Sequence, residues 1–199
     1  MKPLNHQQTG FTLVELAIVL VVIGLILGMA FKGKDLIDSA KVKSLAAQYN
    51  KILAATNIFY EKYGFYPGDG CPANATSPSA CTNTKNGYVD GGNGSAEVTA
   101  FWSLLAATNI LQASDRKSIF GQNWDLYGAA TTGQLAYGTW LDLPGGAQAD
   151  PRIVCMWDRM SDDGVAGTGR IITLGASYTP TTDCWSQTGQ YNVHAKILP

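Results

Sequence analysis

An acidic residue, Glu15, lies inside an otherwise apolar stretch that begins directly after Gly10. The stretch covers residues 11–31, and a helix of that length spans about 31 Å at about 1.5 Å per residue, close to a bilayer's hydrocarbon core. An ionisable side chain costs about 2.5–3.5 kcal/mol at the centre of a membrane and somewhat less near an end, so it usually has a role there. We therefore expect Glu15 to have a functional partner.

Gly10 is a small residue that precedes the apolar stretch and follows a short polar leader. In an ordinary secretory signal the small residues of the cleavage site come after the apolar segment. Cleavage after Gly10 would instead keep the apolar helix on the mature chain and leave a free amine on Phe11. A Glu15 from a neighbouring helix, staggered along a filament axis, would neutralise that amine, because each group is costly to bury alone.

The sequence of residues 10–15, Gly-Phe-Thr-Leu-Val-Glu, followed by the apolar run, resembles the prepilin leader of type IV pilins and type II secretion pseudopilins. This match covers about the first quarter of the chain. It implies that a prepilin peptidase cuts after Gly10 and methylates Phe11, and that Glu15 is the residue required for assembly. Many pilins have a proline in the second half of this segment, and here there is none.

A second group of candidate functional residues is acidic: Asp158, Asp162 and Asp163 precede Gly164. Carboxylates that converge on a turn can hold calcium together with backbone carbonyls. The resemblance adds that some major pseudopilins bind calcium in a C-terminal acidic loop. The simpler interpretation, which we prefer, is a helix end with an Asp-Gly turn in which Asp162 pairs with Arg170. Structural calcium is the one cofactor that we consider.

Catalysis finds little support in the sequence. The only histidines are His6 and His194, and we find no nucleophile motif, phosphate loop or Cys/His metal spacing. His194 alternates with apolar neighbours in a predicted strand, so we interpret it as a surface or hydrogen-bonded residue rather than a base. Residues 90–97 contain acids among glycines but lack EF-hand spacing, and we interpret them as a turn before a helix. We predict that the chain is not an enzyme.

Charge and cysteine content limit the compartment and the partners. Lys and Arg number 14 against 15 Asp and Glu, which gives no electrostatic footprint for nucleic acid. The four cysteines all lie beyond the apolar stretch, and with an export signal they indicate two disulfides in an oxidising compartment. Three pairings are possible, and we favour the local one, Cys71–Cys81 with Cys155–Cys184.

The orientation in the membrane rests on two conflicting signals. Lysines are more numerous after the apolar stretch than before it, which alone favours a cytoplasmic C-terminal domain. The cysteines and the need for the leader to face its peptidase outweigh that count. We expect a single-pass protein of the bacterial inner membrane with a cytoplasmic N-terminus, found after assembly in a surface pilus or a periplasmic pseudopilus.

The apolar stretch continues into an amphipathic helix. From Lys34 to Tyr63, apolar residues recur at alternating steps of three and four, and no proline occurs between residues 11 and 66. One helix is therefore predicted from about residue 11 to residue 63. Gly64 is suited to a left-handed cap and Pro67 prevents the helix from resuming.

Beyond residue 70 the sequence predicts a long loop and then short elements. They are a loop at 71–95, a helix at 96–110 with Ser95 as N-cap, a β-hairpin of 124–127 and 135–143 across the turn at 131–133, a helix starting at Asp150-Pro151, and strands at 169–174 and 191–198.

Together these features predict an α+β, pilin-like fold. A long N-terminal helix, transmembrane in its first half, would pack on a small antiparallel sheet, with extra short helices and disulfide-stapled loops. We divide the chain into a leader (1–10), an assembly helix (11–33) and a globular head (34–199).

The resemblance implies a structural subunit of a type IV pilus-like filament. Its partners would be copies of itself and other pilins, the prepilin peptidase, and an inner-membrane assembly platform. A disulfide near the C-terminus, such as Cys155–Cys184, favours this function. The first alternative is a pseudopilin of type II secretion, which a calcium site at residues 158–163 would favour. The second is a membrane-tethered binding or enzymatic domain that never polymerises.

Overall fold

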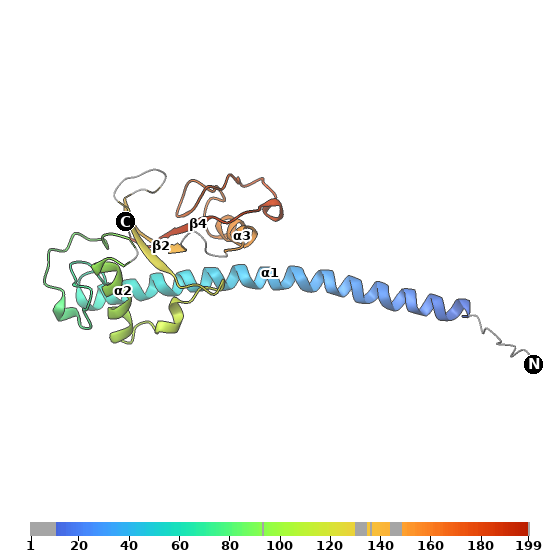
Figure 1. Ribbon diagram of the computed structural model, residues 1–199, viewed down its shortest axis with the longest axis horizontal. Helices are drawn as coiled ribbons and strands as arrows, with labels where there is room; N and C mark the ends of the chain where they lie inside the picture. Colours follow the sequence, from blue (N-terminus) through green and yellow to red (C-terminus); the bar gives the residue numbers. More distant parts are fainter. Residues whose placement is uncertain (1–10, 93, 130–134, 136, 144–148, 199) are drawn as a thin grey trace, which may run out of the picture. The chain divides into compact units, whose positions relative to one another are not determined.

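The computed structural model describes residues 11–92, 94–129, 135, 137–143 and 149–198, apart from the side chain at position 31. The described elements are, in chain order, α1 (Leu13–Tyr63), η1 (Pro78–Ala80), α2 (Ala96–Ala107), η2 (Ala113–Arg116), β1 (Asp125–Ala129), β2 (Gly138–Leu143), α3 (Pro151–Ser161), β3 (Ile171–Leu174), η3 (Cys184–Ser186) and β4 (Asn192–Lys196) (Figure 1). The chain forms two compact units, residues 1–40 and 41–199, and α1 runs through both. The long N-terminal helix expected from the sequence is confirmed.

The first unit contains the apolar part of α1. The large apolar side chains between residues 13 and 29 are all exposed. An 18-residue window of the helix has a mean hydropathy of 2.8, and by length and composition the helix is able to cross a membrane. Such a surface is typical of a helix that is surrounded by lipid or by other helices, because exposure of this apolar area to water is unfavourable.

In the second unit the remaining part of α1 forms one side of the core. Its buried residues follow the helical spacing expected from the sequence: Val42, Leu45, Tyr49, Ile52, Ala55 and Phe59. The helix ends at Tyr63 because Gly64 takes a φ of +79° and donates its N–H to the carbonyl of Tyr60 at 2.8 Å. Gly64 therefore acts as the predicted left-handed cap.

The sheet is antiparallel throughout, in the order β1-β2-β4-β3. Side chains alternate between the two faces of a strand, and one face joins the core that α1 lines. That face contributes Leu126, Leu141, Leu143, Ile171, Val193 and Ala195. The predicted hairpin is the pair β1–β2. Strand β1 begins and ends slightly later than predicted, and β2 begins at Gly138 rather than residue 135 but ends at Leu143 as predicted. The predicted turn at 131–133 lies outside the described residues.

Both longer helices of the second unit begin at the predicted caps. The Ser95 hydroxyl accepts the N–H of Val98 at the start of α2, and the Asp150 carboxylate accepts the N–H of Arg152 at the start of α3. Helix α2 stops at Ala107 rather than near residue 110, because Asn109 takes a φ of 55° that ends helical geometry.

The outer edges of the two outer strands, β1 and β3, accept other segments of the chain, which hydrogen-bond to them. At β1 the N–H of Gly128 donates to the carbonyl of Gly91 at 2.7 Å, so the loop before α2 lies along this edge. A Cβ at Gly128 would lie 2.3 Å from the carbonyl oxygen of Val89, so only glycine permits this approach. At β3 the N–H of Thr173 donates to the carbonyl of Ala166 at 2.7 Å.

The structure contains the two local disulfides, Cys71–Cys81 and Cys155–Cys184. The first staples the long loop after α1. The second joins the buried interior face of α3 to η3, across a sequence separation of 29 residues. It therefore ties a long C-terminal segment to the core.

We expect replacement of both Cys155 and Cys184 by alanine to lower the free energy of unfolding by about 3–4 kcal/mol, because a loop of this length is no longer closed in the unfolded chain. Denaturant unfolding of the full chain in detergent, followed by tryptophan fluorescence, measures the change. The matched Cys71→Ala/Cys81→Ala variant opens a shorter loop and should lose somewhat less. A Cys155→Ala/Cys184→Ala variant as stable as the native chain would contradict this expectation.

Candidate assembly segment and acidic turn

Glu15 is held by its own helix start in the first unit. Its Oε2 accepts the backbone N–H of Thr12 at 2.8 Å and the Thr12 hydroxyl at 2.9 Å, and the Thr12 hydroxyl oxygen accepts the N–H of Glu15 at 3.3 Å. This reciprocal arrangement is a capping box, which needs Ser or Thr followed three residues later by Glu or Gln. We did not predict it, although Thr-x-x-Glu before an apolar run is its sequence signature.

Phe11 is the first described residue and is 85% exposed, next to the capping box. Gly10, on the other side of the expected cleavage point, lies outside the described residues. Because Glu15 is already hydrogen-bonded by Thr12, pairing with the amine of another subunit requires an exchange of partners. The exchange replaces neutral donors by a charged one, which forms stronger hydrogen bonds to a carboxylate.

The three acids singled out in the C-terminal half do meet in space. Asp158, Asp162 and Asp163 each offer a carboxylate oxygen, and these atoms lie within 4.8 Å of one another. Asp158 is buried at the end of α3, and its two oxygens accept the N–H of Gly164 at 3.1 Å and the hydroxyl of Tyr178 at 2.8 Å. Burial raises the pKa of Asp158 to about 6.

The other two carboxylates of this turn also accept donors from the chain. Asp162 binds the backbone N–H groups of Arg170 and Ile171, and Asp163 binds the N–H of Val165 at 2.9 Å. The predicted pairing of Asp162 with Arg170 is therefore made through the backbone. The Arg170 guanidinium donates to the Tyr49 hydroxyl at 2.8 Å instead. The donor set suits calcium chemically, and the same oxygens organise the turn between α3 and β3.

The acids of residues 90–97 organise a loop. The Glu97 carboxylate accepts the N–H of Gly70 at 2.9 Å and that of Asp90 at 2.7 Å. Partial burial raises the pKa of Glu97. Among the described residues, the three acids of residues 158–163 are the group whose ligand atoms lie within 4.8 Å of one another. The contacts of Glu97 with Gly70 and Asp90 lie in a turn before α2, which is the position that we interpreted from the sequence.

Residues 5–31 match the family model described as the prokaryotic N-terminal methylation motif. The chain carries a prepilin-type N-terminal segment. In type IV pilins and pseudopilins this segment is the site of cleavage and methylation. No curated protein and no solved structure matches the chain.

The prepilin-type segment and the fold agree with each other. The motif covers the exposed apolar side chains of α1 between residues 13 and 29, and the second unit has the antiparallel sheet, short helices and disulfides of a pilin-like fold. The chain therefore combines a prepilin-type N-terminal segment with an α+β, pilin-like fold.

His194 does not occupy the surface or hydrogen-bonded position that we expected, and that interpretation is wrong. It is 4% exposed, on the face of the sheet opposite α1. Its Nδ1 lies 3.2 Å from Oδ1 of Asp142, and neither ring nitrogen has a well-aligned hydrogen bond within the described chain. Asp125 is the register partner of Asp142 on β1 and forms an ion pair with Arg116 at 3.3 Å.

Burial sets the protonation of this pair. It lowers the pKa of His194 to about 4 and raises the pKa of Asp142 to about 7, where the charge of Asp125 adds a smaller effect. The Asp142 contribution to stability is lost as pH rises from its ordinary pKa of 3.8 towards 7. The His194 contribution is lost as pH falls from 6.5 towards 4. The two contributions to the free energy of unfolding therefore change with pH in opposite directions.

We therefore expect the pair to leave the native free energy of unfolding nearly independent of pH between about 4 and 6.5. In Asp142→Asn the free energy of unfolding should rise with pH, and in His194→Gln it should fall, each by up to about 1.4 kcal/mol per pH unit. Denaturant unfolding at several pH values measures the slopes. Two variants with parallel pH dependence would show that these groups do not titrate in opposite senses.

Proposed function

We propose that the chain is a structural subunit of a type IV pilus-like filament, cleaved after Gly10, methylated on Phe11 and polymerised through the apolar part of α1. One observation carries the proposal. The methylation motif includes the apolar first part of α1. The most apolar 18-residue window of this helix is 0% buried, so no other part of the described chain covers it. A helix that survives cleavage and is not covered needs a bilayer before assembly and other helices afterwards.

The partners and the location follow from this function. The subunit waits in the bacterial inner membrane with its N-terminus in the cytoplasm, where the prepilin peptidase processes it. An inner-membrane assembly platform then adds it to other pilins and to copies of itself. The role is structural rather than enzymatic, in keeping with the family in which the motif occurs.

Two features of the second unit favour different kinds of filament. The Cys155–Cys184 disulfide ties a C-terminal loop to α3, which favours a surface pilus. The convergence of Asp158, Asp162 and Asp163 favours the second candidate, a calcium-binding pseudopilin of type II secretion.

If this second candidate holds, calcium should raise the melting temperature of the full chain, and it should not do so in the Asp163→Asn variant.

The deciding experiment analyses filaments sheared from intact cells. Mass spectrometry should find this chain in bulk, beginning at N-methyl-Phe11. In the pseudopilin case the same mature chain is absent from sheared material and is cross-linked to its own copies in the cell envelope. A mature chain that is neither sheared off nor cross-linked to copies would support the membrane-tethered, non-polymerising alternative.

A further inference from the structure

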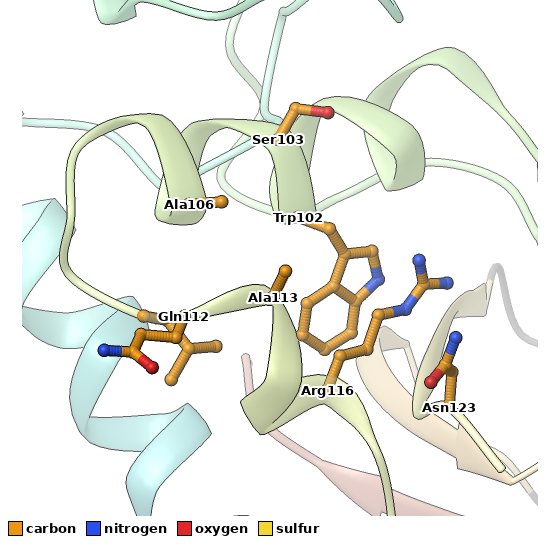
Figure 2. Close-up of a pocket in the computed structure, with 8 residues that line it drawn as sticks. Trp102, Ser103, Ala106, Gln112, Ala113, Arg116 and Asn123 are labelled. Atoms are coloured by element: carbon orange, nitrogen blue, oxygen red, sulfur yellow. The ribbon is translucent and has the colours of Figure 1, made fainter.

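A pocket of about 320 Å³ lies between α2 and η2 in the second unit (Figure 2). One part of its wall is apolar and is formed by Ala106, Leu111 and Ala113. Another part of the wall is polar and contains Trp102, Arg116 and Asn123, and Figure 2 shows these three on the same side of the view. The prepilin-type motif does not involve this pocket.

Arg116 is fixed in the pocket by contacts on one edge of its guanidinium. Its Nε donates to the carbonyl of Trp124 at 2.7 Å, and its Nη2 lies 3.3 Å from Asp125. The guanidinium carbon lies over the Trp102 ring, 4.9 Å from the ring centroid. No partner of Nη1 occurs in the part of the chain that the structure describes. An edge with free N–H groups is thus held in one place.

The other polar groups of the pocket also favour a ligand that accepts hydrogen bonds. The indole Nε1 of Trp102 has no hydrogen-bond partner in the described chain and is buried beside the Arg116 side chain, so its N–H reports on changes at Arg116 (Figure 2). Gln112 uses its side-chain oxygen to accept an N–H of η2, which leaves its amide NH₂ as the free end. Among the described residues, no acid lines the pocket. Neighbouring Asp115 pairs with Lys51 at 2.8 Å, and Asp125 contacts Arg116 from outside the lining.

We propose that this pocket binds a carboxylate carried on a short apolar chain. A planar carboxylate matches the free edge of a guanidinium, which can donate two parallel hydrogen bonds. The carbon chain of the ligand would lie against Ala106, Leu111 and Ala113. A free short-chain carboxylate and the side chain of a glutamate from another polypeptide share this chemistry.

The probe for the test is butyrate, with butyramide as its uncharged match. Full-length protein in detergent, labelled with ¹⁵N-tryptophan, gives an indole N–H signal for each tryptophan, and Trp102→Phe assigns the one of interest. At pH 7 butyrate should shift the Trp102 signal saturably in the millimolar range, and butyramide should leave it in place. Ala106→Leu, which fills the pocket, should weaken the response at least fivefold, whereas Ala107→Leu, next to it in α2 and outside the pocket, should not.

Several outcomes would overturn the proposal: no saturable shift at 100 mM butyrate, an equal shift with butyramide or with sodium chloride, or equal responses in the two leucine variants. The capped peptides Ala-Glu-Ala and Ala-Gln-Ala distinguish the source of the carboxylate. Tighter binding of the glutamate peptide than of butyrate assigns the pocket to an acidic side chain. Binding of butyrate alone assigns it to a small molecule.

Discussion

Glu15→Ala and Glu15→Gln subunits are both expected to yield no filaments when they are the only copies in the cell. Glutamine preserves the capping box with Thr12, since either Glu or Gln serves in that motif, but it removes the charge. The Phe11 amine would then enter the filament core unpaired, at a cost of several kcal/mol per subunit. Electron microscopy and immunoblots of sheared material measure the loss.

Thr12→Val provides the matched control for the Glu15 variants. It removes the hydroxyl that binds Glu15 and keeps the carboxylate and the backbone N–H, so filaments should still form. Membrane insertion of the Glu15 variants should be unharmed, because the segment becomes more apolar. Filaments of normal number from Glu15→Gln alone would show that Glu15 acts through the helix cap and not through its charge.

Gly10→Val should block processing completely. A side chain at the scissile position replaces the hydrogen of glycine, so the peptidase should leave residues 1–10 on the chain. Intact mass should show the unmethylated precursor in the membrane, and no filaments should form because the Phe11 amine is never released. Gly24→Ala is the matched control within the helix, where a Cβ meets no atom within 4 Å, and it should be cleaved normally. Normal processing of Gly10→Val would place the cleavage point elsewhere.

The elements that the sequence predicts best are those with local signals. The spacing of Leu45, Ile52 and Phe59 marks the buried face of α1, and Gly64 marks its end. Ser95 and Asp150 each bind an N–H within three residues of themselves, so neither cap depends on the rest of the fold. Such signals act before any tertiary contact is made.

The contacts that the sequence did not predict depend on strand order. Strand β4, last in the chain, inserts between β2 and β3, and this alone brings His194 against Asp142. Nothing in the local alternation of β4 distinguishes a buried imidazole from an exposed one. The stacking of Arg116 on Trp102 likewise joins a helix to a separate turn, and no periodic pattern connects the two.

The covered edges of the sheet matter when many copies of the second unit lie close together. A filament would hold many copies of the second unit at a very high local concentration, where exposed strand edges recruit one another into intermolecular cross-β structure. The outward N–H of Gly128 on β1 and that of Thr173 on β3 are already bonded within the chain, which leaves fewer free donors to start such pairing. Any side chain at Gly128 would lift the covering loop and open β1. This glycine thus keeps the covering loop on β1, in a part of the sequence separate from the prepilin-type segment.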